Sequence, residues 1–169
     1  KLEKAKAGSL FLTKLDDIMW LYNIRGRDVE CNPVAISYAY VSMKEICLFI
    51  QAAALTSEVK AYLEENGVTI REYAGFTDFV KERSGEKILL DLRYCGYGIY
   101  KDASAKNQVI DAPNPTELFK AVKNPTELAN MEKIYMEDNV ALTKFIYWLK
   151  TNIGKMEITE VSASDRLEQ

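Results

Sequence analysis

The 169-residue sequence contains no histidine, and this absence excludes several kinds of active site. Serine or cysteine nucleophiles that a histidine activates cannot be formed, and neither can zinc sites built on two histidines. The commonest general base at neutral pH is also missing. Any catalysis by these residues would therefore rest on carboxylate, lysine, tyrosine or cysteine side chains.

Cysteines and long apolar runs are also scarce. Cys31, Cys47 and Cys95 form no Cys-x-x-Cys pair, and we interpret them as free thiols of a reducing cytoplasm. The longest apolar runs, such as residues 46–50, are far shorter than the ~20 residues that cross a bilayer. The net charge of −3 provides no general attraction to nucleic acid or anionic membranes. We therefore expect a globular cytoplasmic chain that binds neither nucleic acid nor membrane.

Residues 1–113 alternate between short apolar strands and helices. Strands are predicted at 8–13, 34–41, 45–51, 68–73, 87–92 and 108–110, with the second and third joined by a tight turn as an antiparallel hairpin. Helices are predicted at 14–22, 56–66, 76–83 and 93–101. Thr13 should cap the first of these, and Thr56 or Ser57 the second. This pattern predicts an α/β domain with a mixed sheet flanked by helices.

Residues 114–169 differ in character, because the pentapeptide Asn-Pro-Thr-Glu-Leu occurs at 114–118 and again at 124–128. Asparagine at the cap, proline at the first helical position and glutamate at the third form a helix start, which is used here twice. The second copy should begin a helix that ends near residue 152, and Thr159 should cap another. We interpret 114–169 as a linker and the opening helices of a truncated second domain.

The long helix carries an apolar stripe that the α/β domain does not account for. An open apolar face of this length favours association, so we expect it to fold back on the α/β domain or to meet a second copy of the chain in a homodimer. The stripe consists of Met131, Tyr135, Leu142, Phe145, Ile146 and Leu149.

Three other features are weaker candidates for chemistry. Gly96-Tyr97-Gly98 matches no phosphate-binding spacing, and we interpret it as the close packing of a short helix. Asp16, Asp17 and Asp91 could form a two-metal nuclease site, but helix capping and a turn account for them. Cys95 follows Arg93 closely but has no histidine partner, so an inert thiol is favoured.

The loop Arg25-Gly26-Arg27-Asp28 is the best candidate for a functional site, because it suits neither a buried strand nor an amphipathic helix. In one interpretation it is a solvated turn in which Asp28 pairs with an adjacent arginine, a contact that contributes less than ~1 kcal/mol. In the other, Arg25 presents its planar guanidinium to a carboxylate or to a neighbouring domain. The residues alone leave both interpretations open.

A longer motif surrounds this loop. Residues 16–34 match the pattern D-x-I-x-W-L-x-N-x-R-G-x-D-x-x-x-N-P-V, and Ser-Tyr-Ala follows at 37–39. This region resembles the second domain of the long-form Xaa-Pro aminopeptidases. Residues 121–127 and 158–168 resemble the junction and opening helices of that family's "pita-bread" catalytic domain. Prolidase and creatinase share the architecture, but their linking loops are less similar to this one.

The resemblance implies a creatinase-type N-terminal α/β domain with ribonuclease H-like topology at 1–113, followed by part of a catalytic domain at 114–169. It implies that the parent protein is a metallo-hydrolase that removes an N-terminal residue preceding proline from short peptides. Such enzymes use two divalent metals, commonly manganese, on two aspartates, a histidine and two glutamates. Those ligands lie beyond residue 169, so we expect no catalytic residue, metal or cofactor in this fragment.

For the loop, the resemblance implies a position facing the absent catalytic domain. Arg25, Arg27, Asp28 and Asn32 would then limit access to the active site and help to hold the domains together. The alternative function is a stand-alone module of the same fold that binds a small ligand or a protein without peptidase activity.

Overall fold

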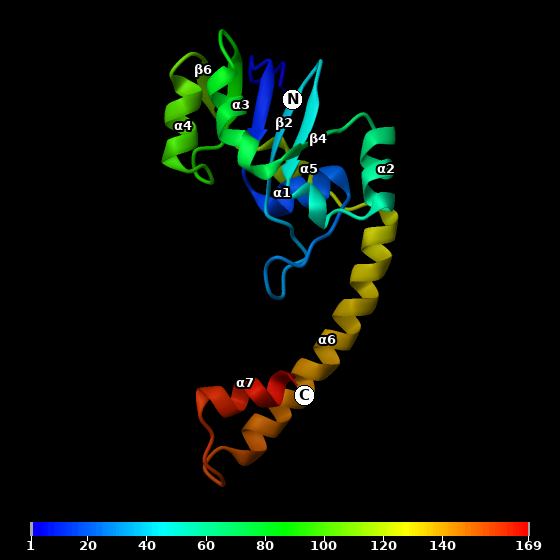
Figure 1. Ribbon diagram of the computed structural model, residues 1–169. Coiled ribbons are helices and arrows are strands. Elements are labelled where there is room, and N and C mark those ends of the chain that lie inside the picture. The colour runs from blue at the N-terminus through cyan, green and yellow to red at the C-terminus, as the bar shows by residue number, and fades with distance from the viewer. Residues whose placement is uncertain (1, 169) are drawn as a thin grey trace. The chain divides into compact units, whose positions relative to one another are not determined.

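The computed structural model describes residues 2–168, which divide into two compact units between Ala121 and Val122 (Figure 1). In the first unit, the described residues form one six-stranded sheet with the strand order β4-β3-β2-β1-β5-β6. Only β2 runs antiparallel to its neighbours in this sheet. The strands are β1 (Ser9–Leu12), β2 (Ser37–Ser42), β3 (Ile46–Ile50), β4 (Thr69–Glu72), β5 (Lys87–Leu90) and β6 (Gln108–Asp111). The predicted α/β fold with a mixed sheet is confirmed.

Helices cover both faces of this sheet because successive strand residues point to opposite sides. In β1, Leu10 and Leu12 belong to one apolar core while Phe11 belongs to the other. The first core is covered by α1 (Leu15–Tyr22) and α2 (Ser57–Glu65). The second is covered by α3 (Phe76–Glu82), whose Phe76 and Phe79 rings pack against Phe11, and by α4 (Tyr97–Ser104). Short apolar strands therefore supply two cores at once.

Several local predictions are confirmed. The hairpin of β2 and β3 is antiparallel, with Ser37 opposite Ile50 and Val41 opposite Ile46. The Thr56 side chain caps α2 by accepting a hydrogen bond from the Val59 N–H at 3.3 Å. Two short 3-10 helices, η1 (Ala52–Ala54) and η2 (Tyr73–Gly75), follow β3 and β4.

Two local predictions are wrong, and both concern the segments that follow β1 and β5. Thr13 does not cap α1. The N-cap residue is Lys14, which makes no side-chain capping hydrogen bond, and the Thr13 hydroxyl donates to the Tyr94 carbonyl at 2.7 Å. The helix predicted at 93–101 is α4 and begins only at Tyr97. Its start is delayed because the Asp91 carboxylate accepts the Arg93 backbone N–H and holds a turn there.

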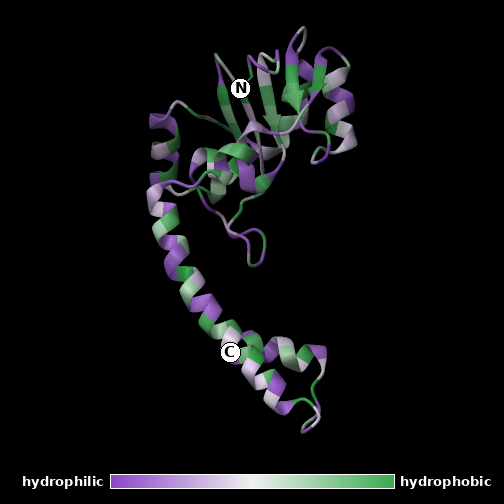
Figure 2. Ribbon diagram, turned by 180° about the vertical axis from the view of Figure 1, so that it is seen from behind, coloured by the Kyte–Doolittle hydropathy of each residue, from purple (hydrophilic) through white to green (hydrophobic). Residues whose placement is uncertain are grey.

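The chain then forms α5 (Pro115–Ala121) within the first unit, and α6 (Pro125–Asn152) and α7 (Glu160–Glu168) within the second. Apolar and polar residues alternate along α6, which buries none of its residues (Figure 2). Thr159 caps α7 as predicted, accepting the Ser162 N–H at 3.1 Å. In residues 2–168 there is no helix long and apolar enough to cross a membrane.

Candidate functional site

The candidate loop follows α1, whose last turn ends at Asn23 in the left-handed conformation. Its two arms run side by side: the Gly26 N–H donates to the Pro33 carbonyl at 3.3 Å, and the Asp28 N–H donates to the Val34 carbonyl at 3.1 Å. A Cβ atom on Gly26 would lie 2.6 Å from the Ala35 Cβ and 2.7 Å from the Val34 carbonyl oxygen. Only glycine therefore allows the arms to approach this closely.

Arg25 is directed at its own helix. Its guanidinium donates to the Ile24 carbonyl at 2.8 Å and to the Met19 carbonyl at 3.4 Å. Met19 lies in the last turn of α1, where backbone carbonyls lack partners within the helix and a positive charge is favoured. Arg25 thus contributes to the C-terminal cap of α1.

Asp28 also has a local structural contact, since its carboxylate accepts the Ile36 N–H at 2.8 Å. The pairing of Asp28 with Arg25 or Arg27, which one of the two interpretations of the loop involved, is not among the ion pairs of the described residues. Arg27 is exposed and, within residues 2–168, makes no side-chain hydrogen bond or ion pair. Asn32 is exposed near the tip, where its N–H donates to the Val29 carbonyl at 3.2 Å. Arg27 and Asn32 are therefore the members of the predicted site whose side chains are available to a partner.

The loop forms one wall of a cavity of about 590 Å³. The opposite wall comes from η1, the start of α2 and the segment that follows β4. This volume lies in the range of small-molecule sites in proteins, about 300–1,000 Å³. Apolar side chains line most of it, with Arg25, Arg27, Gln51, Thr56 and Glu72 among the polar lining residues.

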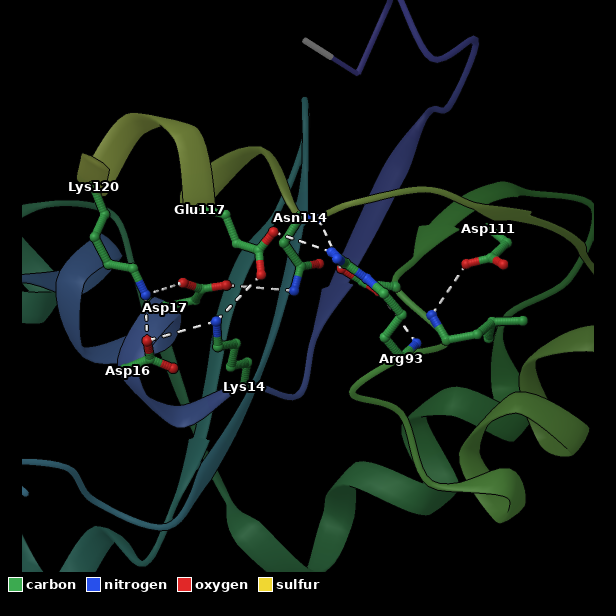
Figure 3. Close-up of polar contacts among 10 residues, drawn as sticks. Lys14, Asp16, Asp17, Arg93, Asp111, Asn114, Glu117 and Lys120 are labelled. Atoms are coloured by element: carbon green, nitrogen blue, oxygen red, sulfur yellow. Dashed lines mark hydrogen bonds and ion pairs between the residues drawn. The ribbon is translucent and has the colours of Figure 1, made fainter. Parts of the chain in front are cut away.

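A second polar site lies where β1 and β5 end. These strands are parallel neighbours, but α1 continues from β1 on one face of the sheet and α4 follows β5 on the other. Where the connections from two adjacent strands run to opposite faces of the sheet, they leave a crevice at the carboxyl ends of the strands. Open α/β sheets usually bind ligands in this crevice. Here α5 occupies the crevice, and charged side chains from three segments meet around it (Figure 3).

Asp17 is the most deeply buried of these groups, with none of its surface exposed. Its carboxylate accepts a hydrogen bond from the Lys120 ammonium at 2.7 Å and a longer one from the Asn114 amide at 3.4 Å. Lys120 also donates to Asp16. One lysine of α5 therefore binds two carboxylates in the first turn of α1.

The other half of the network joins α5 to the segment after β5. Glu117 accepts hydrogen bonds from Lys14 at 3.2 Å and from Arg93 at 3.0 Å. Arg93 also binds Asp91 through two nitrogens, at 2.6 and 2.9 Å. The Asn114 N–H donates to the same Asp91 carboxylate at 3.2 Å.

These contacts favour the charged form of each partner. The Arg93 guanidinium holds the pKa of Asp91 below its usual range, and hydrogen bonds from Lys14 and Arg93 do the same for the pKa of Glu117. Burial alone would raise the pKa of Asp16 and lower that of Lys120. The hydrogen bonds and the charge attraction between Lys120 and the two aspartates, with Lys14 also near Asp16, together outweigh burial, so the pKa of Asp16 is lowered and the pKa of Lys120 is raised.

The carboxylates considered for a nuclease site belong to one network, because Asn114 contacts both Asp17 and Asp91, but they are bound to cations. Asp16 and Asp17 bind Lys120, and Asp91 binds Arg93. Among residues 2–168, no three histidine, cysteine, aspartate or glutamate side chains are grouped so that they could hold a metal ion. The arrangement can therefore bind a helix by charge, but its carboxylates are not free to act as metal ligands.

Sequence reasoning missed the role of α5. Asn114 was expected to cap it, but the Asn114 Nδ2 donates to Asp17, and the Oδ1 is buried without a hydrogen-bond partner among residues 2–168. A signal was present in the spacing, since Glu117 and Lys120 are three residues apart and share a helix face. For Cys95, burial raises the pKa of the thiol to about 11, in agreement with the inert thiol expected there.

Residues 1–127 match the family model described as "Creatinase/Prolidase N-terminal domain". The Podospora anserina protein "Probable Xaa-Pro aminopeptidase P" is 39% identical over 100% of this chain, which covers 27% of that protein. The Dictyostelium discoideum protein "Xaa-Pro aminopeptidase 1" is 32% identical over 99% of this chain, which again covers 27% of the relative. The chain thus spans about a quarter of the length of these relatives.

Solved structures agree on the fold. X-prolyl aminopeptidase from Caenorhabditis elegans, described as a cytosolic enzyme with a di-nuclear active site, matches with a TM-score of 0.80 and 28% identity. That match covers 98% of this chain and 28% of the other. Xaa-Pro dipeptidase from Bacillus anthracis matches with a TM-score of 0.72 at 15% identity, over 99% of this chain and 44% of the other, and shows the fold alone.

Proposed function

The chain belongs to the creatinase/prolidase N-terminal domain family, and from this premise we propose that it is a non-catalytic region of a metal-dependent Xaa-Pro aminopeptidase. One observation carries the proposal: relatives with that name align with essentially the whole chain, at 39% and 32% identity. The parent protein would remove an N-terminal residue that precedes proline from short peptides. We further propose that residues 1–113 are its N-terminal-like domain and that 114–169 are a linker and the opening helices of its catalytic domain. The parent protein is proposed to act in the cytoplasm.

The residues of this chain do not fit a di-nuclear metal centre. There is no histidine in the sequence, and the carboxylates of Asp16, Asp17 and Asp91 are paired with Lys120 and Arg93. Two divalent ions, which we propose to be manganese, would therefore be bound by residues outside this chain. No chemical step is assigned to the residues present here.

We propose that the loop carrying Arg25, Arg27, Asp28 and Asn32 faces the catalytic domain and shapes access to its active site. Its rigidity supports this role, because the Gly26 contact and the Asp28 hydrogen bond hold the two arms together. Within the loop, Arg27 and Asn32 would make the external contacts, while Arg25 and Asp28 hold the loop in shape. A rigid loop presents such groups at a low entropic cost.

The test compares the chain with its full-length parent. The parent should cleave an Arg-Pro-Pro peptide when manganese is supplied, and the 169-residue chain should not. Isothermal titration of the chain with manganese should give only weak binding without a defined stoichiometry. A stoichiometric micromolar site together with peptide cleavage by the chain would overturn the proposal.

The loop is tested in the same parent enzyme. Arg27→Gln should raise KM or lower kcat for the peptide without lowering the melting temperature. Arg25→Gln should lower the melting temperature, because it removes the donors at the end of α1. Unchanged kinetics in Arg27→Gln would refute the access role of that side chain.

The alternative, a stand-alone binding module, is favoured by one observation, the cavity of about 590 Å³ beside the loop. It predicts that the parent protein lacks peptidase activity and that the isolated chain binds a ligand in this cavity. Chemical-shift changes confined to the cavity residues during titration with a peptide mixture would support it. Peptidase activity of the parent would argue for the first proposal instead.

A further inference from the structure

The helix α5 is held mainly by polar contacts. Thr116 is its only buried residue, and Asn114, just before the helix, is buried as well. Its large apolar side chains, by contrast, are only about half covered, with 56% of Leu118 and 44% of Phe119 accessible. Partial apolar burial is not directional, so the charged network must supply the specificity.

The surface that receives α5 is a defined set of charged side chains, which we call the socket. It consists of Lys14, Asp16, Asp17, Asp91 and Arg93. The socket contacts side chains at every third position of the incoming segment: Asn114, Glu117 and Lys120. Residues three apart lie on the same face of a helix, so one helix face carries all the recognition.

The same pentapeptide occurs again ten residues later, which raises the question of how the socket distinguishes the copies. The first copy (114–118) and the second copy (124–128) are identical, and each offers asparagine and glutamate with the same spacing. At the third recognised position the two segments differ, because Lys120 corresponds to Asn130. The lysine is therefore the recognised side chain that can discriminate between them.

We propose that the socket recognises a helix start with asparagine, glutamate and lysine at positions 0, +3 and +6, and that Lys120 selects the first copy. Asp17 is the group that recognises the lysine, because its carboxylate is fully buried and accepts a hydrogen bond from Lys120 at 2.7 Å. With Asn130 in that place, the buried carboxylate of Asp17 would face only a short amide, while Lys14 would remain 3.8 Å from Asp16. A buried carboxylate without a counter-charge is strongly disfavoured.

The consequence is a fixed length of chain between β6 and the socket. Docking of the first copy leaves the second copy free to form its own capping box, which begins α6 at Pro125. Docking of the second copy would break that box and place ten more residues in the connection after β6. Lys120 thus determines which copy of the pentapeptide enters the socket and which copy begins α6.

The first experiment removes the charge at Lys120. Lys120→Met should lower the melting temperature of the 169-residue chain by about 5–10 °C, since an unpaired buried carboxylate remains. Amide exchange in residues 115–121 should become at least tenfold faster, while β1 and β5 change little. Lys133→Met is the matched control, because Lys133 is an exposed lysine of α6 without a contact among the described residues. Equal behaviour of the two variants would overturn the proposal.

The second experiment transfers the lysine to the other copy. Acetylation with limiting acetic anhydride, read by mass spectrometry, should modify Lys120 of the unaltered chain at least tenfold more slowly than Lys133, because Lys120 is bound in the socket. In Lys120→Asn/Asn130→Lys, the lysine introduced at position 130 should become the protected one. The melting temperature should also rise above that of Lys120→Asn alone.

Two results would contradict selection by the lysine. One is that the introduced lysine is acetylated as fast as Lys133 and the transfer variant melts no higher than Lys120→Asn. The other is that Lys120 of the unaltered chain is itself acetylated as fast as Lys133. Acetylation of Lys120 in the unaltered chain needs no variant, so this measurement tests the proposal even where a variant folds poorly.

Discussion

The two copies of Asn-Pro-Thr-Glu-Leu show how one pentapeptide can be used in two ways. In the second copy, the Asn124 side chain accepts the Glu127 N–H at 2.9 Å, and Glu127 accepts the Asn124 N–H at 2.8 Å. In the first copy, Asn114 binds Asp17 and Glu117 binds Lys14 and Arg93. Both copies begin a helix, so local sequence determines the helix start, while long-range charge determines where the side chains go.

The largest effect should follow when the socket loses Asp17. Asp17→Ala leaves the ammonium of Lys120 without its buried partner and removes the acceptor of the Asn114 amide. Unfolding by urea should show a loss of ~3 kcal/mol, as for other buried pairs that lose one member. Loss of the cap in the second copy, by Asn124→Ala, should lower the unfolding free energy much less. A loss below ~1 kcal/mol for Asp17→Ala would mean that long-range charge does not hold the first copy more strongly than its cap holds the second.

Acid should weaken the first copy through its carboxylates. The native pKa values of Asp16 and Asp91 lie below the ordinary 3.8, and that of Glu117 lies below the ordinary 4.5. Their contribution to stability is therefore complete above those ordinary values and is lost as the pH falls through the lowered native values. Lys14 and Lys120 have raised pKa values, so their contribution is complete below 10.5 and is lost at higher pH.

Amide exchange measured as a function of pH, corrected for the intrinsic rate, checks this expectation. Protection of residues 115–121 should remain constant between about pH 5 and pH 9 and fall below about pH 4. In Lys120→Met the same segment should already be poorly protected at pH 7. Protection that stays constant down to pH 2.5 would show that charge does not hold α5.

A smaller effect is expected at the cap of the second copy. Asn124→Ala removes the acceptor of the Glu127 N–H and should cost ~1 kcal/mol, the usual value of an N-cap. The loss should be confined to the first turn of α6, where amide exchange becomes faster. Exchange in residues 115–121 should not change, and a change there would mean that the two copies are energetically coupled.

The smallest effect concerns the threonine of each copy. The Thr116 hydroxyl is buried without a hydrogen-bond partner among the described residues, whereas Thr126 is exposed. Thr116→Val keeps the shape and removes an unsatisfied hydroxyl, so it should raise the unfolding free energy by ~0.5–1 kcal/mol. Thr126→Val should change it by less than ~0.5 kcal/mol. A destabilising Thr116→Val would indicate that this hydroxyl has a partner in solution.

Much of the fold was predictable because each element carries its own signal. The strands are short apolar runs with turn residues between them. Leu10, Phe11 and Leu12 point alternately to the two faces of the sheet and so belong to two cores. The start of α6 was predictable because the capping box is complete within four residues. Such signals do not depend on the rest of the chain.

The charged site around α5 was predicted less well than the fold, because its contacts join residues that are far apart in the sequence. Lys120 and Asp17 are 103 positions apart in the chain, and no local pattern joins them. The same reason explains Thr13, whose hydroxyl meets Tyr94 instead of capping α1. In the loop, the sequence indicated a special role for Arg25, but the direction of its guanidinium toward Met19 depends on how the loop folds back.

The most direct test of the account is a double-mutant cycle on Asp17→Asn and Lys120→Met, with unfolding free energies measured in urea. If Asp17 recognises Lys120, each single variant should lose stability, and the double variant should recover much of that loss. The coupling energy between the two positions should then be at least ~1.5 kcal/mol. A coupling energy below ~0.5 kcal/mol would contradict the account, because it would mean that the first copy is held in place without the buried charge pair.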